Sequence, residues 1–135
     1  TMLGSPSAEM QSNAAGALSC LSRDNHENQS AIARTGAIAP LCTLVREGNP
    51  ETKETCASAL WALSAENAPN KATIAKLGGI EPLVGLLVGG ATEKSQENAA
   101  GALASLASKH SEVPLQLRES KVLLTTDPFL PHPCA

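Results

Sequence analysis

Hydrophobic residues along most of this chain recur every three or four positions, which is the spacing that places them on one face of an α-helix. The first such pattern covers residues 8–22, where the apolar stripe consists of Met10, Ala14, Ala17, Leu18 and Leu21. Polar breaks and glycines separate it from further helical patterns over residues 38–46 and 51–65. The patterning therefore predicts an all-helical chain.

An alanine-rich phrase occurs three times and gives the chain a period. The phrase reads Asn-Ala-Ala-Gly-Ala-Leu at residues 13–18 and again at 98–103, with a looser copy between them. Its leucines, Leu18, Leu60 and Leu103, are separated by 42 and 43 residues. A period of about 40–47 residues is typical of helical solenoids. Alanine is small enough to let helices approach closely, and it has the highest helix propensity.

Each repeat is predicted to contain a short, a middle and a long helix. Asn28 is expected to cap the first short helix, which stops near Gly36, and Pro40 falls in the first turn of the middle helix, where its missing N–H costs nothing. In the next repeat, Thr92 is expected to cap a long helix that ends near Ser108. The same residue types return 42 positions later at Asn70, Ile74, Gly78, Ile80, Pro82 and Leu83.

A third repeat begins after the last alanine phrase and then degrades. Leu117 takes the place that isoleucine holds in the earlier repeats, but Lys121 stands where the turn glycine is expected. Prolines at 128, 131 and 133 exclude a helix at the end of the chain. We expect a lead-in over residues 1–7, a solenoid over 8–119 and an irregular Pro-rich tail over 120–135, either disordered or tied down as an extended strap.

These recurring residues resemble armadillo repeats. The resemblance rests on Asn70-Lys71 with Ile74 and Gly78, on residues 79–87, and on residues 98–103, and it covers about residues 8–119. It implies a right-handed α-solenoid of three-helix repeats, with about two complete repeats flanked by partial ones. It also implies a concave groove, lined by the long third helices, that binds extended peptides. Armadillo proteins are adaptors, receptors and scaffolds, and the resemblance implies no catalysis and no cofactor.

A solenoid this short is expected to leave apolar surface at both ends. One repeat cannot bury its apolar face alone, and at least three repeats are usually needed for stability. We therefore expect the chain to be a piece of a longer solenoid or a subunit held in a larger assembly.

The resemblance also allows a comparison with known binding patterns. In the importin-α branch, Trp and Asn at regular positions of the third helices clamp a basic peptide. Here the Asn positions hold Cys20, Ala62 and Ser105, and the Trp positions hold Gly16, Ser58 and Gly101. A row of Lys and Arg, as in a β-catenin-like groove, is missing too. We expect no binding of nuclear-import cargo by these repeats.

Most of the residues expected to line the groove have small side chains. Trp61 is the single large amphipathic group, and it reads either as a core residue at the edge or as an interface anchor. The acidic residues favour the first turns of helices, and they also offer a weak acidic patch to a basic partner. The full set is Gly16, Cys20, Arg23, Glu54, Ser58, Trp61, Ala62, Glu97, Gly101 and Ser105.

Composition narrows the class of partner. The chain has 135 residues and a net charge of −3, so it lacks the basic face that nucleic acid requires. Only 1% of its residues are aromatic, which leaves no platform for stacking bases. No run of about 18 apolar residues occurs, so no membrane-spanning helix is expected, and no signal peptide is visible at the N-terminus. We expect a protein or peptide partner.

Cysteine and histidine patterns give no sign of a metal site or of catalysis. The four cysteines form no CxxC pair and are expected to be buried, reduced thiols of an intracellular, cytoplasmic protein: Cys20, Cys42, Cys56 and Cys134. His26 and His110 fall in turns without a nucleophile nearby, and Gly78-Gly79 is a helix stop rather than a phosphate loop. We predict a non-catalytic scaffold that binds a protein or peptide. The alternative is a structural subunit packed permanently in a larger complex.

Overall fold

The structure is a computed structural model, and it describes residues 7–90 and 92–108 of the 135-residue chain. The predicted lead-in up to residue 6, the third repeat and the Pro-rich tail over residues 120–135 lie outside the described residues. Cys134, Leu117 and His110 belong to the same excluded part.

Seven helices make up the described part of the chain, and their lengths recur as 15, 9, 10, 15, 9, 10 and 15 residues. Short, middle and long helices therefore alternate as the sequence predicts. Their bounds are α1 (Ala8–Ser22), α2 (His26–Arg34), α3 (Ile38–Glu47), α4 (Pro50–Ser64), α5 (Ala68–Lys76), α6 (Ile80–Gly89) and α7 (Glu93–Ala107).

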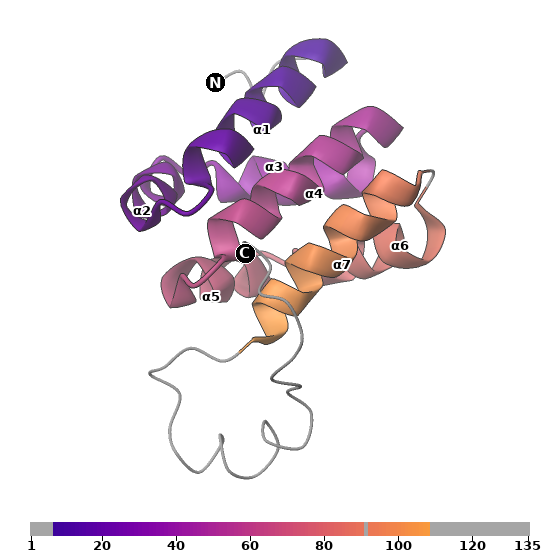
Figure 1. The fold of residues 1–135 in the computed structure, drawn as a ribbon. Coiled ribbons are helices and arrows are strands. Elements are labelled where there is room, and N and C mark those ends of the chain that lie inside the picture. Colours follow the sequence, from indigo (N-terminus) through magenta and orange to yellow (C-terminus); the bar gives the residue numbers. More distant parts are fainter. Residues whose placement is uncertain (1–6, 91, 109–135) are drawn as a thin grey trace, which may run out of the picture.

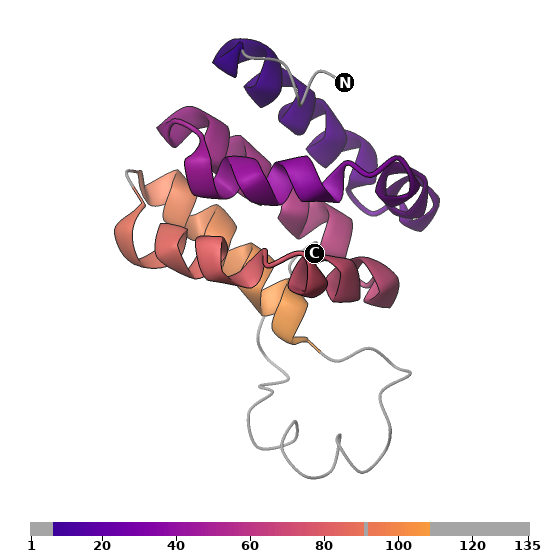
Figure 2. The ribbon, with the colours of Figure 1, turned by 180° about the vertical axis from the view of Figure 1, so that it is seen from behind.

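The long helices α1, α4 and α7 lie side by side as one layer (Figure 1), and α4 packs against both of the others. The view from behind shows α3 and α6 covering that layer (Figure 2), with α3 against α4 and α6 against α7. The short helices α2 and α5 turn the chain between the layers. The result is an all-α solenoid with two complete three-helix repeats, α2–α4 and α5–α7, preceded by one long helix.

Side-chain caps explain where the helices start, and they correct one prediction. Asn25, and not Asn28, caps α2: its Oδ1 accepts from the backbone N of Asn28 at 2.9 Å. Asn28 lies inside the helix, and its Nδ2 donates to the carbonyl of Leu21 at 2.8 Å. Both asparagines suit a cap, and only the path of the turn after α1 decides between them. Thr92 caps α7 as predicted, since its Oγ1 accepts from Ser95 N at 2.9 Å.

The turns repeat as faithfully as the helices. Asp24 and Glu66 follow the long helices with φ of 55° and 53°, in the left-handed region that residues with a side chain adopt at a cost. Gly36 and Gly78 follow the short helices with φ of 82° and 77°, where glycine carries no such cost. Both pairs are 42 residues apart, so the repeat extends to backbone conformation.

The core lies between the two layers, and it corrects the predicted face of α1. Met10 and Leu21 are 45% and 55% exposed, and the side that α1 buries is instead Ser12, Ala15, Ser19 and Ser22. Of the predicted apolar stripe, Ala14 and Leu18 are partly buried against the core, whereas Met10 and Leu21 are exposed. The predicted core face of α3 is confirmed: Leu41 and Val45 are buried, and Leu44 is partly buried against the core.

Hydroxyl pairs join neighbouring long helices. Ser12 Oγ lies 2.8 Å from Thr55 Oγ1, and Ser19 Oγ lies 2.9 Å from Ser58 Oγ, both between α1 and α4. Ser64 Oγ donates to Ser105 Oγ at 2.8 Å between α4 and α7. These small side chains satisfy each other, so the helix backbones approach closely without leaving buried polar atoms unpaired.

A buried amide network ties one repeat to the next. Gln29 Nε2 on α2 donates to the carbonyls of Ala62 and Ala65 at 2.9 and 3.1 Å. Asn67 Nδ2 donates to Gln29 Oε1 at 3.1 Å, and Asn70 Nδ2 donates to the backbone oxygen of Gln29 at 3.1 Å. All three amides are at most 2% exposed. The repeat order is thus fixed by specific hydrogen bonds as well as by apolar packing.

The cysteines of the described part are free, and they differ in environment. Cys42 and Cys56 are buried as predicted, whereas Cys20 is exposed, which corrects the prediction for that residue. Burial raises the pKa of Cys42 to about 11, an effect that nearby Arg46 partly offsets. Burial and the neighbouring Cys42 raise the pKa of Cys56 to about 12. Both buried thiols are therefore protonated and unreactive at neutral pH.

None of the described helices is by itself long and apolar enough to cross a membrane. Taken together, α5 and α6 meet the criteria of length and composition as a pair bent by 82°.

Candidate functional site

The candidate site is the side of α1, α4 and α7 turned away from α3 and α6, which we term the long-helix face (Figure 1). The ten residues expected to line a groove all belong to these three helices or to the residue that follows α1. Apart from Arg23 and Trp61, they lie at matching positions 42 or 43 residues apart. They are Gly16, Cys20 and Arg23 from the first, Glu54, Ser58, Trp61 and Ala62 from the second, and Glu97, Gly101 and Ser105 from the third.

Trp61 and Gly101 form the most specific contact among these residues. A Cβ added at Gly101 would lie 2.5 Å from Cδ2 and Cε2 of the Trp61 indole, so the ring lies directly against the backbone of α7. Trp61 is half-buried and packs against the core. Its Nε1 is buried without a hydrogen-bond partner in the described structure. The glycine of the third alanine phrase thus makes room for the tryptophan of the second.

The other two positions where importin-α carries Trp hold small residues. Ser58 is half-buried and pairs with Ser19 at 2.9 Å. A Cβ added at Gly16 would lie 3.6 Å from Thr55 Cγ2, an ordinary van der Waals contact. Positions 16 and 58 therefore carry no large side chain that projects from the long-helix face near Trp61.

The positions where importin-α carries Asn are mostly inaccessible. Ala62 and Ser105 are 5% and 1% exposed, and the hydroxyl of Ser105 accepts from Ser64. Of the three, Cys20 alone is exposed. The face therefore offers no ladder of amides to a peptide backbone, and Ala62 and Ser105 act in packing.

The charged residues of the set are dispersed. Glu54 Oε1 accepts from Thr92 Oγ1 at 2.9 Å, so this carboxylate already has a partner within the protein. Glu97 is exposed near the start of α7, and Arg23 is exposed at the C-terminal end of α1. The structure brings none of these three charges into contact with another of them.

Clusters of side chains that could bind a metal ion or exchange protons are sparse among the described residues. No group of three or more His, Cys, Asp or Glu side chains in residues 7–90 and 92–108 is arranged to hold a metal ion. A hollow of about 550 Å³ lies beside the turns after α1 and α4, where Asp24, His26 and Glu66 line it together with the buried Gln29.

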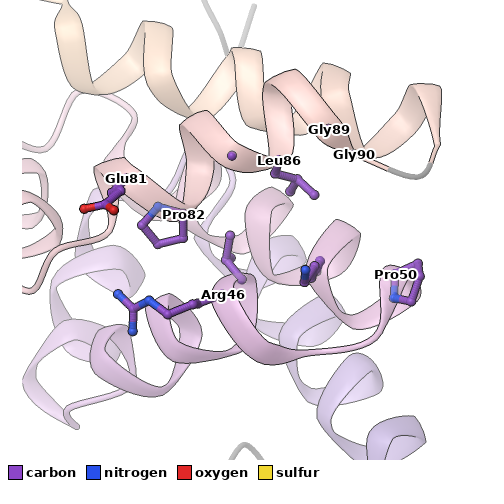
Figure 3. Close-up of a pocket in the computed structure, with 10 residues that line it drawn as sticks. Arg46, Pro50, Glu81, Pro82, Leu86, Gly89 and Gly90 are labelled. Atoms are coloured by element: carbon purple, nitrogen blue, oxygen red, sulfur yellow. The ribbon is translucent and has the colours of Figure 1, made fainter.

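Sequence reasoning missed a second concave feature. A cleft of about 420 Å³ opens between α3 and α6, on the other layer from the long helices (Figure 3). Arg46, Lys53 and Glu81 supply its charges. The available signal was Gly85, a glycine inside a helical pattern, which is unfavourable in a helix and often has a packing or functional reason.

Comparisons with known proteins agree with this fold. A family model described as the Armadillo/beta-catenin-like repeat matches residues 25–65 and 67–108. The structure of an engineered protein matches with 29% identity and a TM-score of 0.73, covering 77% of this chain and 42% of that one. A designed armadillo repeat protein matches with 27% identity and a TM-score of 0.72, over 77% of this chain and 43% of its own.

Another designed armadillo repeat protein, solved in complex with the peptide (KR)4, matches with 25% identity and a TM-score of 0.70, over 77% of this chain and 43% of its own. The chain thus spans less than half the length of these three structures. Its sequence has no match among curated proteins.

Proposed function

This chain belongs to the armadillo repeat family, and on that premise we propose that it is a non-catalytic interaction module that binds a protein or an extended peptide. The proposed binding surface is the long-helix face. The proposed partner is not a nucleic acid, because the chain carries a net charge of −3 and has only one Trp and one Phe.

One observation carries the proposal: a half-buried tryptophan stands among small residues on an otherwise plain face. Trp61 is half-buried, and its ring packs against Gly101 and the core. Because Gly16 and Ser58 have no side chain or only a small one, no large side chain projects from those two positions of the face. This suits a peptide that lies across the helices. Tryptophan is among the residue types that are enriched at the energetic centres of interfaces.

The bound peptide of the designed relative does not carry over directly. That protein was solved with (KR)4, whereas here the Trp and Asn positions of importin-α hold Gly, Ser, Cys and Ala. We propose a partner that places an apolar side chain against Trp61 rather than a run of Lys and Arg.

Trp61 also supplies the test, because it is the only tryptophan and its fluorescence reports on the face. Peptides selected from a random display library on the full chain are titrated while Trp61 emission is followed. We expect a saturable change in emission. Isothermal titration calorimetry then compares the parent with Trp61→Ala, which lacks the fluorophore, and we expect the substitution to weaken binding at least about thirtyfold, since an interface hot spot contributes about 2 kcal/mol or more.

Two further variants serve as controls for that test. Trp61→Phe keeps a ring over Gly101, and it should lose affinity while melting close to the parent. Thr43→Ala, at an exposed position on α3, should change neither property. If Trp61→Ala lowered only the melting temperature and left affinity for the selected peptides unchanged, the anchor role would be refuted.

A structural subunit is the second candidate function, and the apolar surface at both ends favours it. Met10 and Leu21 are exposed on α1, as are Val84, Leu87 and Val88 on α6. Exposed apolar side chains of this kind are typical of surfaces that contact another protein. For both candidates we propose an intracellular location, since buried free thiols such as Cys56 are usual where thiols stay reduced.

A further inference from the structure

The cleft between α3 and α6 has walls of different chemistry (Figure 3). Arg46 from α3 and Glu81 from α6 lie at one end, and Pro50, Gly89 and Gly90 lie toward the other. Leu86 contributes an apolar wall. The volume of about 420 Å³ is within the range of sites that bind small ligands or a few residues of a peptide.

The wall that α6 contributes to the cleft lacks a side chain at Gly85, and packing does not require a glycine at this position. Another glycine, at the start of α6, serves as a comparison. A Cβ added at Gly79 would come within 2.7 Å of Ile74 Cγ2, so glycine is needed there. A Cβ added at Gly85 or Gly89 would meet nothing within 4 Å. Gly89 ends α6, where glycine is common, but Gly85 lies in its interior, where glycine weakens a helix. A glycine at such a position is consistent with the close approach of a ligand to the backbone.

The charge of the cleft is positive in a chain that is negative as a whole. Arg46 and Lys53 line it against the single carboxylate of Glu81, while the chain carries a net charge of −3. Arg46 is exposed and Lys53 is half-buried. Neither forms an ion pair with another residue of the described part, so both cations remain available to an anionic group.

We propose that this cleft binds an acidic segment of a partner protein, at a second site separate from the long-helix face. One acidic side chain of the partner lies against Arg46, and another lies against Lys53. An adjacent aliphatic side chain lies over Gly85, against Pro82 and Leu86. The Glu81 carboxylate accepts a backbone N–H of the segment. Charge therefore selects the partner, and the bare helix surface admits its backbone.

Glycine amides give a direct readout, because Gly85, Gly89 and Gly90 all line the cleft. The ¹⁵N-labelled full chain is titrated with the capped peptide Ac-Leu-Glu-Leu-Glu-NH₂ and with the matched Ac-Leu-Gln-Leu-Gln-NH₂. The expected result is a saturable shift of these three amides with the Glu peptide and little shift with the Gln peptide.

Two pairs of variants locate the binding. Gly85→Leu fills the cleft and should abolish the shifts of Gly89 and Gly90, whereas Gly85→Ala leaves most of the space open and should retain them. The double variant Arg46→Gln, Lys53→Gln should weaken binding about tenfold, as expected for two partly exposed charge contacts. Arg34→Gln, an exposed cation on α2, serves as its control.

Three outcomes would overturn the proposal. The first is that both peptides shift the cleft glycines equally. The second is that sodium phosphate alone shifts them at the same concentration, which would make the cleft a general anion site. The third is that the Glu peptide shifts Gly16 and Gly101 instead, which would place the acidic segment on the long-helix face and leave the function proposed for that face standing.

Discussion

At the scale of single residues, two cysteines in matching alanine phrases have opposite environments. Cys20 follows the first phrase and is exposed, whereas Cys56 begins the second and is completely buried. Cys42, on α3, is buried as well. The environment raises the pKa of Cys42 to about 11 and that of Cys56 to about 12, against a usual value of 9.0. These shifts couple folding to pH in the alkaline range.

We predict that the free energy of unfolding falls as the pH rises above about 9. In the unfolded chain the thiols of Cys42 and Cys56 ionise near pH 9.0, whereas in the folded chain they hold their protons to about pH 11 and 12. The unfolded state therefore binds fewer protons in this window, and the contribution that is complete below pH 9 is progressively lost. Urea denaturation at pH 8, 9 and 10 measures the slope.

Variants separate the thiols from other groups that titrate in the same range. The double variant Cys42→Ala, Cys56→Ala should flatten the slope, and Cys20→Ala should leave it unchanged. Burial lowers the pKa of Lys71 below its usual 10.5, so this amine adds stability as the pH rises through the window below 10.5 and opposes the thiols. An identical slope in the double variant and the parent would contradict the assignment to cysteine.

At the scale of the helices, glycine has opposite consequences in α6 and α7. A Cβ at Gly85 would meet open space, whereas a Cβ at Gly101 would lie 2.5 Å from the Trp61 ring. Both lie in helix interiors, where alanine is preferred over glycine by about 1 kcal/mol. The side chain that alanine adds is therefore harmless on one helix and displaces a neighbour on the other.

We predict that Gly85→Ala raises the free energy of unfolding by about 0.5–1 kcal/mol. Gly101→Ala should lower it by about 1–3 kcal/mol, because the methyl group overpacks the contact with Trp61. Urea denaturation of the two variants gives both values, and Trp61 fluorescence should change only in the second. A stabilising Gly101→Ala would show that the indole can move away freely.

A second pair of residues compares caps in the two repeats. Asn25 and Asn67 cap α2 and α5 with the same backbone angles, φ −133° and ψ 92°. Asn25 is exposed, whereas Asn67 is completely buried and also donates to Gln29 Oε1. The geometry of the cap is thus equal, and only the buried network differs.

Accordingly, Asn25→Ala should cost about 1 kcal/mol of stability, the usual value of a lost cap. Asn67→Ala should cost about 1–3 kcal/mol more, because it also leaves the buried Gln29 oxygen without its donor. Thermal and urea unfolding of both variants measure the difference. Equal losses would mean that the amide network contributes nothing beyond capping.

At the scale of the whole molecule, the solenoid leaves apolar side chains exposed on α1 and on α6. Leu21 is 55% exposed and Val88 is 77% exposed. The matching residues of the neighbouring repeat, Leu63 for Leu21 and Val45 for the exposed Leu87, are buried. The surfaces around Leu21 and Leu87 are therefore of the kind that neighbouring repeats cover.

We predict that the isolated 135-residue chain self-associates. The double variant Leu21→Lys, Val88→Lys should shift sedimentation velocity profiles toward the monomer. Helix content should be preserved, because both positions are exposed and a lysine side chain there can keep its charge in water. Thr43→Lys, at an exposed polar position on α3, is the control. A parent chain that remained a monomer and melted in one cooperative transition would contradict both this prediction and the structural-subunit alternative.

Much of this architecture follows from the sequence alone. The spacing of apolar residues determines where the helices lie, because each helix is a local structure with its own period and its own caps. The 42-residue recurrence of Pro40 and Gly36 at Pro82 and Gly78 determines that the same unit is built twice. These features need no knowledge of distant contacts, and the cap at Thr92 is predictable for the same reason.

Only the tertiary structure decided which surfaces meet. An amphipathic pattern cannot tell whether the Met10 and Leu21 side of α1 or its serine side will be covered, since that depends on where α4 lies. Contacts between residues about 40 positions apart determine the other surfaces: Ser105 accepts a hydrogen bond from Ser64, and Trp61 lies over Gly101. The candidate site was therefore predictable as a set of positions, while its accessibility, and the cleft beside Arg46, arise only when repeats pack.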